Sequence, residues 1–184
     1  MEQKYIDAST SSLKFNLFAF LIGIILFIVA ALLYILLWGT NSLGDTFSIE
    51  GYSEGFTFLF FLLVGIWAHE LLHGLGYIMG GVNRSELKYG FNWKNVIFYV
   101  SCKVPVTMKT YKLAGILPLI VLGVFPTLIA LLFEGLGLLF FWSLTMLMMC
   151  SGDIYMLLRI RNFPLNSLVI EHPKRVGCYV LENN

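Results

Sequence analysis

The chain has 184 residues, of which 58% are hydrophobic and 12% charged, and its mean hydropathy is +0.81. Soluble domains average about 45–50% apolar and 25% charged residues, so this composition is typical of an integral membrane protein. The net charge of +1 gives no indication of nucleic-acid binding. Three cysteines without Cys-x-x-Cys spacing predict neither a disulfide framework nor a zinc knuckle.

Four stretches of the chain are long and apolar enough to cross about 30 Å of hydrocarbon. The first exceeds the apolar core of a signal peptide and lacks a cleavage site, so we expect a retained anchor. The sequence therefore predicts an all-α integral membrane protein that forms a single polytopic domain over residues 1–184. The predicted transmembrane helices are residues 15–38, 56–79, 113–133 and 136–158.

The basic residues indicate how these helices are oriented. All twelve lysines and arginines lie before the first helix, between the second and third (residues 84–112), or after the fourth (residues 159–184). The connection between the first and second helices contains Asp45, Glu50 and Glu54 but no basic residue. The positive-inside rule therefore predicts that both termini, the middle loop and the tail are cytoplasmic and that the protein is a multi-pass protein of the cell membrane.

The second apolar stretch contains the pattern His-Glu-x-x-His. On a helix, His69 and His73 lie on the same face one turn apart, so both imidazoles can reach one metal ion. Glu70 points to a neighbouring part of the helix and is free to act as general base on a water held by the metal. Ionisable side chains inside a membrane are costly and usually functional, which argues against a coincidental polar cluster. Gly74 and Gly76 permit either close helix packing or room for a substrate.

The middle loop is rich in aromatic and β-branched residues, and we interpret residues 87–91 and 95–104 as two strands. They predict a short cytoplasmic β-hairpin-like insertion between the second and third helices. The hairpin either only packs on the cytoplasmic face or offers an edge that pairs with an extended peptide near the metal. Pro118 and Pro126 predict kinks in the third helix.

The fourth apolar stretch contains one acid, Asp153, six residues or about 9 Å before its cytoplasmic end at Arg159. His73 lies at a similar depth, seven residues or about 10 Å before Gly80. Two imidazoles, one carboxylate and one water form a catalytic zinc shell. The rival third ligand is His172, which would require the tail to fold back into the bilayer.

These residues resemble the site-2 protease class of intramembrane metalloproteases, and more closely a bacterial family of putative zincin peptidases. The similar stretches lie between Gly55 and the C-terminus: residues 69–76, 102–118, Ser151-Gly152-Asp153 and residues 171–177. The resemblance implies one zinc ion held by His69, His73 and Asp153, with Glu70 as the base. The chain departs from the site-2 protease pattern in the order Gly152-Asp153, where those proteases usually carry Asp-Gly.

We therefore expect a membrane-embedded zinc metalloprotease that hydrolyses peptide bonds in or near the cytoplasmic leaflet. Its expected substrate is a membrane-protein segment or a membrane-associated peptide. The first alternative is a non-catalytic membrane protein with a protease-like fold that binds zinc or a partner helix. The second is a metal transporter, which would need ionisable groups on both sides of the midplane, whereas the outer halves of these stretches contain none.

The charge asymmetry predicts the result of a topology experiment. A reporter domain fused after Asn184 or inserted within residues 84–112 should be located in the cytoplasm, because these segments hold basic residues. A reporter within residues 42–53 should be external. An external reporter after Asn184 would contradict the matched depths of His73 and Asp153.

Overall fold

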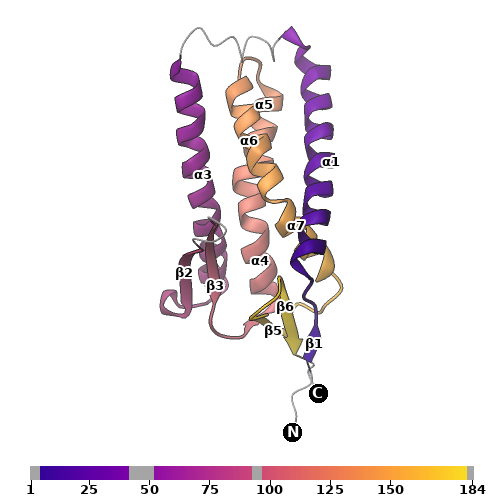
Figure 1. The fold of residues 1–184 in the computed structure, drawn as a ribbon, viewed down its shortest axis with the longest axis vertical. Coiled ribbons are helices and arrows are strands. Elements are labelled where there is room, and N and C mark those ends of the chain that lie inside the picture. The colour runs from indigo at the N-terminus through magenta and orange to yellow at the C-terminus, as the bar shows by residue number, and fades with distance from the viewer. Residues whose placement is uncertain (1–4, 42–51, 93–96, 182–184) are drawn as a thin grey trace.

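The computed structural model describes residues 5–41, 52–92 and 97–181. Four helices in it are long and apolar enough to span a membrane, as the sequence predicted: Ser12–Trp38, Gly55–Met79, Met108–Leu132 and Gly137–Arg159. They run side by side, and the β-strands gather at one end of them (Figure 1). Most of the loop predicted to be external, residues 42–51, lies outside the described residues.

The first two helices present apolar side chains outward. They are α1 (Ser12–Trp38) and α3 (Tyr52–Met79). Leu13 and Leu36 of α1 are each 81% exposed, and Phe60 of α3 is 62% exposed. Water-soluble proteins seldom expose contiguous apolar surface of this kind, so the surface is typical of helices that face lipid.

The third helix is not uniform, because its two prolines interrupt the α-helical hydrogen bonds. It consists of α4 (Met108–Pro118), a π-helical stretch η2 (Leu119–Val124) and α5 (Phe125–Leu132). In the wider turns the Phe125 N–H donates to the Ile120 carbonyl, five residues back. The additional residue per turn accommodates the ring of Pro126, which would collide with a carbonyl of a regular α-helix.

The fourth helix is divided at Cys150 into α6 (Gly137–Met149) and α7 (Ser151–Arg159). Cys150 has φ −70° and ψ −4°, outside the α-helical optimum, and α7 diverges from α6 towards α1 (Figure 1). Gly152 permits the close approach of α1, because a Cβ there would lie 2.6 Å from the Phe15 ring. The division places Asp153 in the first turn of α7.

The predicted hairpin is present and lies beside α3. A short 3₁₀ turn, η1 (Arg84–Glu86), leads into β2 (Leu87–Asn92), which pairs antiparallel with β3 (Ile97–Cys102). Leu87 is opposite Cys102, and Phe91 is opposite Phe98. The connection between the strands, residues 93–96, lies outside the described residues.

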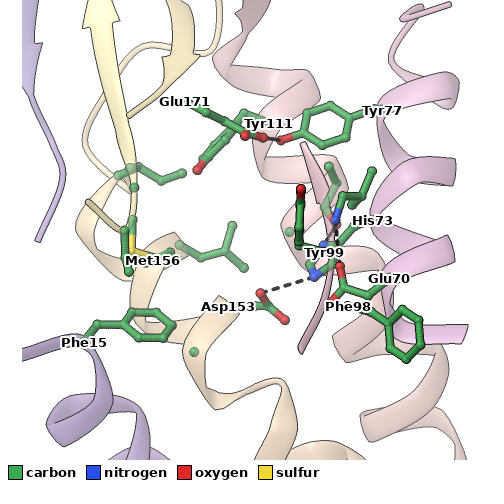
Figure 2. A pocket seen from close by; sticks show the side chains of 18 residues that line it. Phe15, Glu70, His73, Tyr77, Phe98, Tyr99, Tyr111, Asp153, Met156 and Glu171 are labelled. Carbon is green, nitrogen blue, oxygen red and sulfur yellow. Dashed lines mark hydrogen bonds and ion pairs between the residues drawn. The ribbon is translucent and has the colours of Figure 1, made fainter. Parts of the chain in front are cut away.

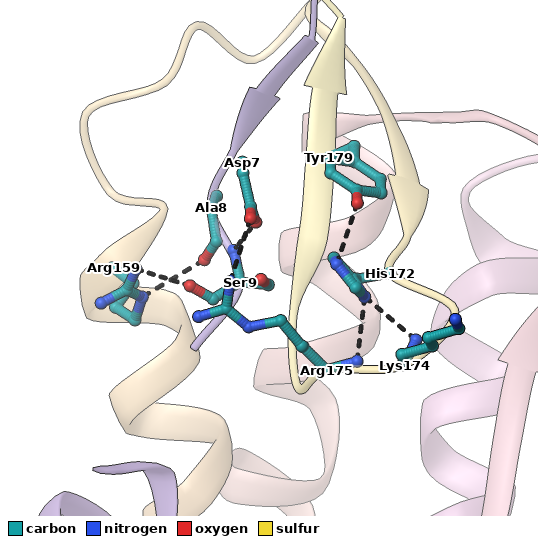
Figure 3. Close-up of polar contacts among 8 residues, drawn as sticks. All are labelled: Asp7, Ala8, Ser9, Arg159, His172, Lys174, Arg175 and Tyr179. Carbon is teal, nitrogen blue, oxygen red and sulfur yellow. Dashed lines mark hydrogen bonds and ion pairs between the residues drawn. The ribbon is translucent and has the colours of Figure 1, made fainter. Parts of the chain in front are cut away.

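A second sheet, which the all-α prediction missed, joins the two ends of the chain. Its strands, in the order β1-β6-β5-β4, are all antiparallel. Arg159 at the end of α7 donates to the Ala8 and Ser9 carbonyls at 3.2 and 3.0 Å, which fixes the segment after β1 (Figure 3). The strands have two to four residues each, too few for an alternating pattern. They are β1 (Tyr5–Asp7), β4 (Val106–Thr107), β5 (Leu168–Glu171) and β6 (Cys178–Leu181).

The two glycines that follow the His-Glu-x-x-His pattern serve close packing. A Cβ at Gly76 would lie 2.5 Å from the Cα of Ala114, so α3 and α4 approach backbone to backbone. A Cβ at Gly74 would collide with the hydroxyl of Tyr89 in the hairpin. The space beside each glycine is therefore occupied by protein rather than left for a substrate.

The Gly76 contact predicts a position-specific effect of a single methyl group. Gly76→Ala should lower the free energy of unfolding by about 1–3 kcal/mol, because neither backbone can yield without separating α3 from α4. Gly55→Ala in the same helix is the matched control: a Cβ there meets nothing within 4 Å, and alanine favours the helix. The measurement is unfolding of both variants in detergent micelles. Equal stability of the two variants would contradict the packing.

Candidate metal centre

Three side chains from two helices converge between α3 and α7. The Nε2 atoms of His69 and His73 are 3.0 Å apart. Asp153 Oδ2 lies 3.3 Å from His69 Nε2, and Asp153 Oδ1 lies 3.5 Å from His73 Nε2 (Figure 2 shows His73 and Asp153). The two histidines meet because residues four apart share a helix face, and Asp153 joins them because the fourth helix turns at Cys150. The structure thus brings together the three predicted ligands.

The Nδ1 atoms of both histidines have partners outside this group. His73 Nδ1 lies 2.9 Å from the Ala114 carbonyl, which can only accept, so this nitrogen carries the proton. His69 Nδ1 lies 3.7 Å from Cys150 Sγ, and Cys150 is completely buried. If His69 Nδ1 donates to Cys150 Sγ, His69 has the same tautomer, and both Nε2 lone pairs then face the Asp153 carboxylate.

Such an arrangement of acceptors fits a cation. In this tautomer two lone pairs and a carboxylate are in contact, and they repel one another unless a positive charge lies between them. Asp153 Oδ2 is buried and accepts no hydrogen bond from the described part of the chain. Ligands about 2.0–2.2 Å from a tetrahedral zinc ion are about 3.3–3.6 Å apart, close to the separations observed here. The donor set therefore fits zinc.

A neighbouring group of possible ligands includes a residue that the sequence analysis did not select. Ligand atoms of His69, Cys150 and Asp153 lie within 4.8 Å of one another, as do those of His69, Glu70 and His73. Cys150 adjoins the opposite ring nitrogen of His69, so it suits a role in orienting that ring. No spacing pattern in the sequence relates Cys150 to a histidine 81 residues earlier.

Glu70 is held at the edge of this centre by the hairpin. Its Oε2 accepts a hydrogen bond from the Val100 backbone N–H of β3, at 3.0 Å. Amides alternate in direction along an antiparallel strand, so the N–H of Val100 points away from β2. The edge of β3 that does not pair with β2 therefore faces the centre, a relation that strand prediction alone does not reveal.

His172, the rival ligand, has both ring nitrogens engaged within the tail. Its Nδ1 accepts from the backbone N–H groups of Lys174 and Arg175 at 3.0 and 2.9 Å (Figure 3). Its Nε2 lies 2.9 Å from the hydroxyl of Tyr179. In the described part of the chain His172 does not line the cavity beside the centre.

The tail does fold back, but through Glu171. Glu171 Oε1 accepts from the hydroxyl of Tyr77 at 3.0 Å and from the backbone N–H of Cys102 at 3.2 Å. Tyr77 lies one helical turn beyond His73 on the same face of α3. Burial raises the pKa of the Glu171 carboxyl, and the two hydrogen bonds partly oppose this effect. In the sequence Glu171 is notable only as part of residues 171–177, and its contact with α3 was not predicted.

A cavity of about 450 Å³ connects these groups. Helices α3, α4 and α7, strand β3 and the tail all contribute to its wall (Figure 2). Glu70, His73 and Asp153 line one part of it, and Glu171 and Tyr77 line another. The cavity is large enough for a few residues of a peptide, and its polar groups are concentrated at these two places.

Comparison with known proteins gives one finding. A family model described as putative zincin peptidase matches residues 62–168, more than half of the chain. The matched region includes the His-Glu-x-x-His pattern, the hairpin and Asp153, and it ends before Glu171 and His172. No curated protein and no solved structure matches the chain.

Proposed function

The chain belongs to the putative zincin peptidase family, and from this premise we propose that it is a zinc metalloendopeptidase embedded in the cell membrane. In this proposal His69, His73 and Asp153 hold one zinc ion, and Glu70 is the general base. The observation that carries the proposal is the contact of the three side chains: the two Nε2 atoms are 3.0 Å apart, and the two Asp153 oxygens lie 3.3 and 3.5 Å from them. We also propose that the protein is similar to site-2 proteases, because its His-Glu-x-x-His pattern lies in an apolar helix.

The reaction proposed is hydrolysis of a peptide bond. A bound zinc ion supplies Lewis-acid chemistry, which makes water more acidic and polarises a peptide carbonyl. Glu70 takes the proton of the attacking water and delivers it to the departing amine. The Ala114 carbonyl keeps the His73 ring in the tautomer whose Nε2 is free to bind metal.

The edge of β3 that does not pair with β2 supports the proposal that the substrate binds as an extended strand. Val100 presents its N–H to the centre, where it now bonds to Glu70. A peptide that pairs with this edge would compete for the same N–H and would release Glu70 towards the water. Substrate binding and exposure of the base would thereby be coupled.

The arrangement of the chain supports placement of the site near the cytoplasmic leaflet. Strands β1 and β6, near the two ends of the chain, lie at the same end of the helices as the hairpin (Figure 1). The loop and tail at this end hold ten of the twelve basic residues. We therefore propose that this end faces the cytoplasm and that a membrane-protein segment or a membrane-associated peptide is the substrate.

A ligand and a base should fail differently when they are removed. We predict that His69→Ala, His73→Ala and Asp153→Ala each lose zinc, because catalytic zinc normally requires three protein ligands. Glu70→Gln should retain one zinc ion per chain but lose hydrolysis by about 10²-fold or more. The measurements are zinc per protein in detergent and cleavage of a quenched fluorescent peptide library.

The matched control for the zinc measurement is His172→Ala, which should retain both zinc and hydrolysis because its ring bonds only within the tail. Loss of zinc from His172→Ala together with full zinc in Asp153→Ala would show that the third ligand is wrong. A wild-type protein that binds no transition metal would contradict the peptidase proposal. Full zinc without hydrolysis of any substrate would favour a binding protein.

Proline substitutions on β3 test the strand-pairing proposal. Phe98 and Val100 both direct their N–H groups away from β2, so proline at either position leaves the pairing with β2 intact. Phe98→Pro and Val100→Pro should reduce cleavage while zinc content is unchanged. Phe98→Pro leaves the contact between Glu70 and Val100 in place, which separates a loss of substrate pairing from a loss of base positioning. Normal cleavage by both folded variants would reduce the hairpin to a packing element.

A further inference from the structure

The cavity beside the candidate centre is lined by carboxylates, aromatic rings and aliphatic side chains. Its described lining contains three carboxylates, Glu70, Asp153 and Glu171, and no lysine or arginine. A zinc ion in the proposed centre would balance the charges of Glu70 and Asp153. The charge of Glu171 would then remain without a counterion in the cavity.

Glu171 has only neutral partners. Its hydrogen-bond donors are the hydroxyl of Tyr77 and the backbone amide of Cys102, and it forms no ion pair with any residue that the structure describes. A partly buried carboxylate loses solvation that neutral donors only partly replace. A ligand with a positive charge would restore the missing interaction.

The walls around Glu171 favour the same kind of ligand. Tyr77 and Tyr111 lie beside Glu171, while Phe98 and Tyr99 line the part of the cavity beside Glu70 and His73 (Figure 2). Aromatic faces attract ammonium and guanidinium groups, most strongly where water is excluded. A carboxylate beside two tyrosine rings, in a cavity with further aromatic rings, therefore has the chemistry of a site for an organic cation.

Strand β3 relates this place to the proposed base. Val100 donates its N–H to Glu70, and Cys102, two residues further along the same edge, donates to Glu171. Two residues of a strand span about 7 Å. In a peptide bound alongside β3, the residue that reaches Glu171 would therefore lie about two residues along the peptide from the residue that lies beside Glu70.

We propose that Glu171 determines specificity by forming a subsite for a positively charged group of the peptide substrate. The group is a lysine or arginine side chain, or the free amino group of a substrate that begins near the cleaved bond. This inference rests on the proposed peptidase function, because it takes the cavity as the substrate site. Glu171 binds substrate charge and takes no part in the chemical step.

The test measures peptide binding without turnover. The probes are fluorescent peptides with one common apolar sequence and with Lys, Gln or Glu at a single position that is moved along the peptide. Binding is measured to the Glu70→Gln protein in nanodiscs, with and without the additional change Glu171→Gln. Glutamine retains an oxygen that can accept from Tyr77 and Cys102, so the tail keeps its contact with α3.

We expect the Lys peptide to bind at least about tenfold more tightly than the Glu peptide, at one position of the series. Glu171→Gln should reduce this ratio to near one. Asp7→Asn is the matched control, because it changes the net charge equally but lies outside the cavity lining and beside Arg175 (Figure 3). The control should retain the preference for Lys.

Acetylated and free amino termini distinguish the two sources of charge. If Glu171 binds the amino terminus, the free Gln peptide should bind more tightly than its acetylated form, and Glu171→Gln should remove the difference. Equal binding of all peptides to the protein with Glu171 intact would overturn the inference, as would an unchanged preference after Glu171→Gln.

Failure of the proposed function gives a different pattern. If the protein prefers cationic peptides through Glu171 but cleaves none, the subsite is supported and the peptidase proposal is contradicted. If the protein cleaves peptides but binds Lys and Glu peptides equally well, the peptidase proposal is supported and the subsite is contradicted.

Discussion

The central constraint in this structure is the contact of three potential metal ligands inside an apolar helical bundle. His69 Nε2 and His73 Nε2 are 3.0 Å apart, and the Asp153 carboxylate contacts each of them through a different oxygen, at 3.3 and 3.5 Å. With both imidazoles protonated on Nδ1, these groups would repel one another without a cation and would lack solvation, which is costly away from water. Several irregular features of the fold maintain this contact. The turn at Cys150 aims Asp153 at α3, and the close approach at Gly76 brings the Ala114 carbonyl to the His73 ring.

A second level of organisation connects the helices to the strands outside them. Strand β3 donates one amide to Glu70 and another to Glu171, so the hairpin contacts both the proposed base and the tail. The tail in turn pairs with β1, which follows the start of the chain. The cavity wall is thus assembled from segments far apart in the sequence. Any shift of the four-stranded sheet would alter the surroundings of Tyr77 and Glu171.

The sequence was sufficient to predict the long apolar helices and the ionisable residues within them. Four long apolar runs predicted the four helices, and His69, His73 and Asp153 stood out because ionisable groups are rare in such runs. The four-stranded sheet escaped prediction because its pairing joins short strands from the start, the middle and the end of the chain. Glu171 and Cys150 escaped it for a related reason: each acts through a contact across 69 to 94 residues, and no local pattern records that distance.

The most direct test of the central claim is X-ray absorption at the zinc edge on the purified wild-type protein. A zinc ion held by His69, His73 and Asp153 should have a four-coordinate shell of nitrogen and oxygen only, at about 2.0–2.2 Å, with the multiple-scattering signature of two imidazoles. A sulfur ligand at about 2.3 Å would place Cys150 in the shell in place of one of the proposed ligands, and a shell with fewer than two imidazoles would remove His69 or His73 from it. Either result would contradict the zinc site formed by His69, His73 and Asp153.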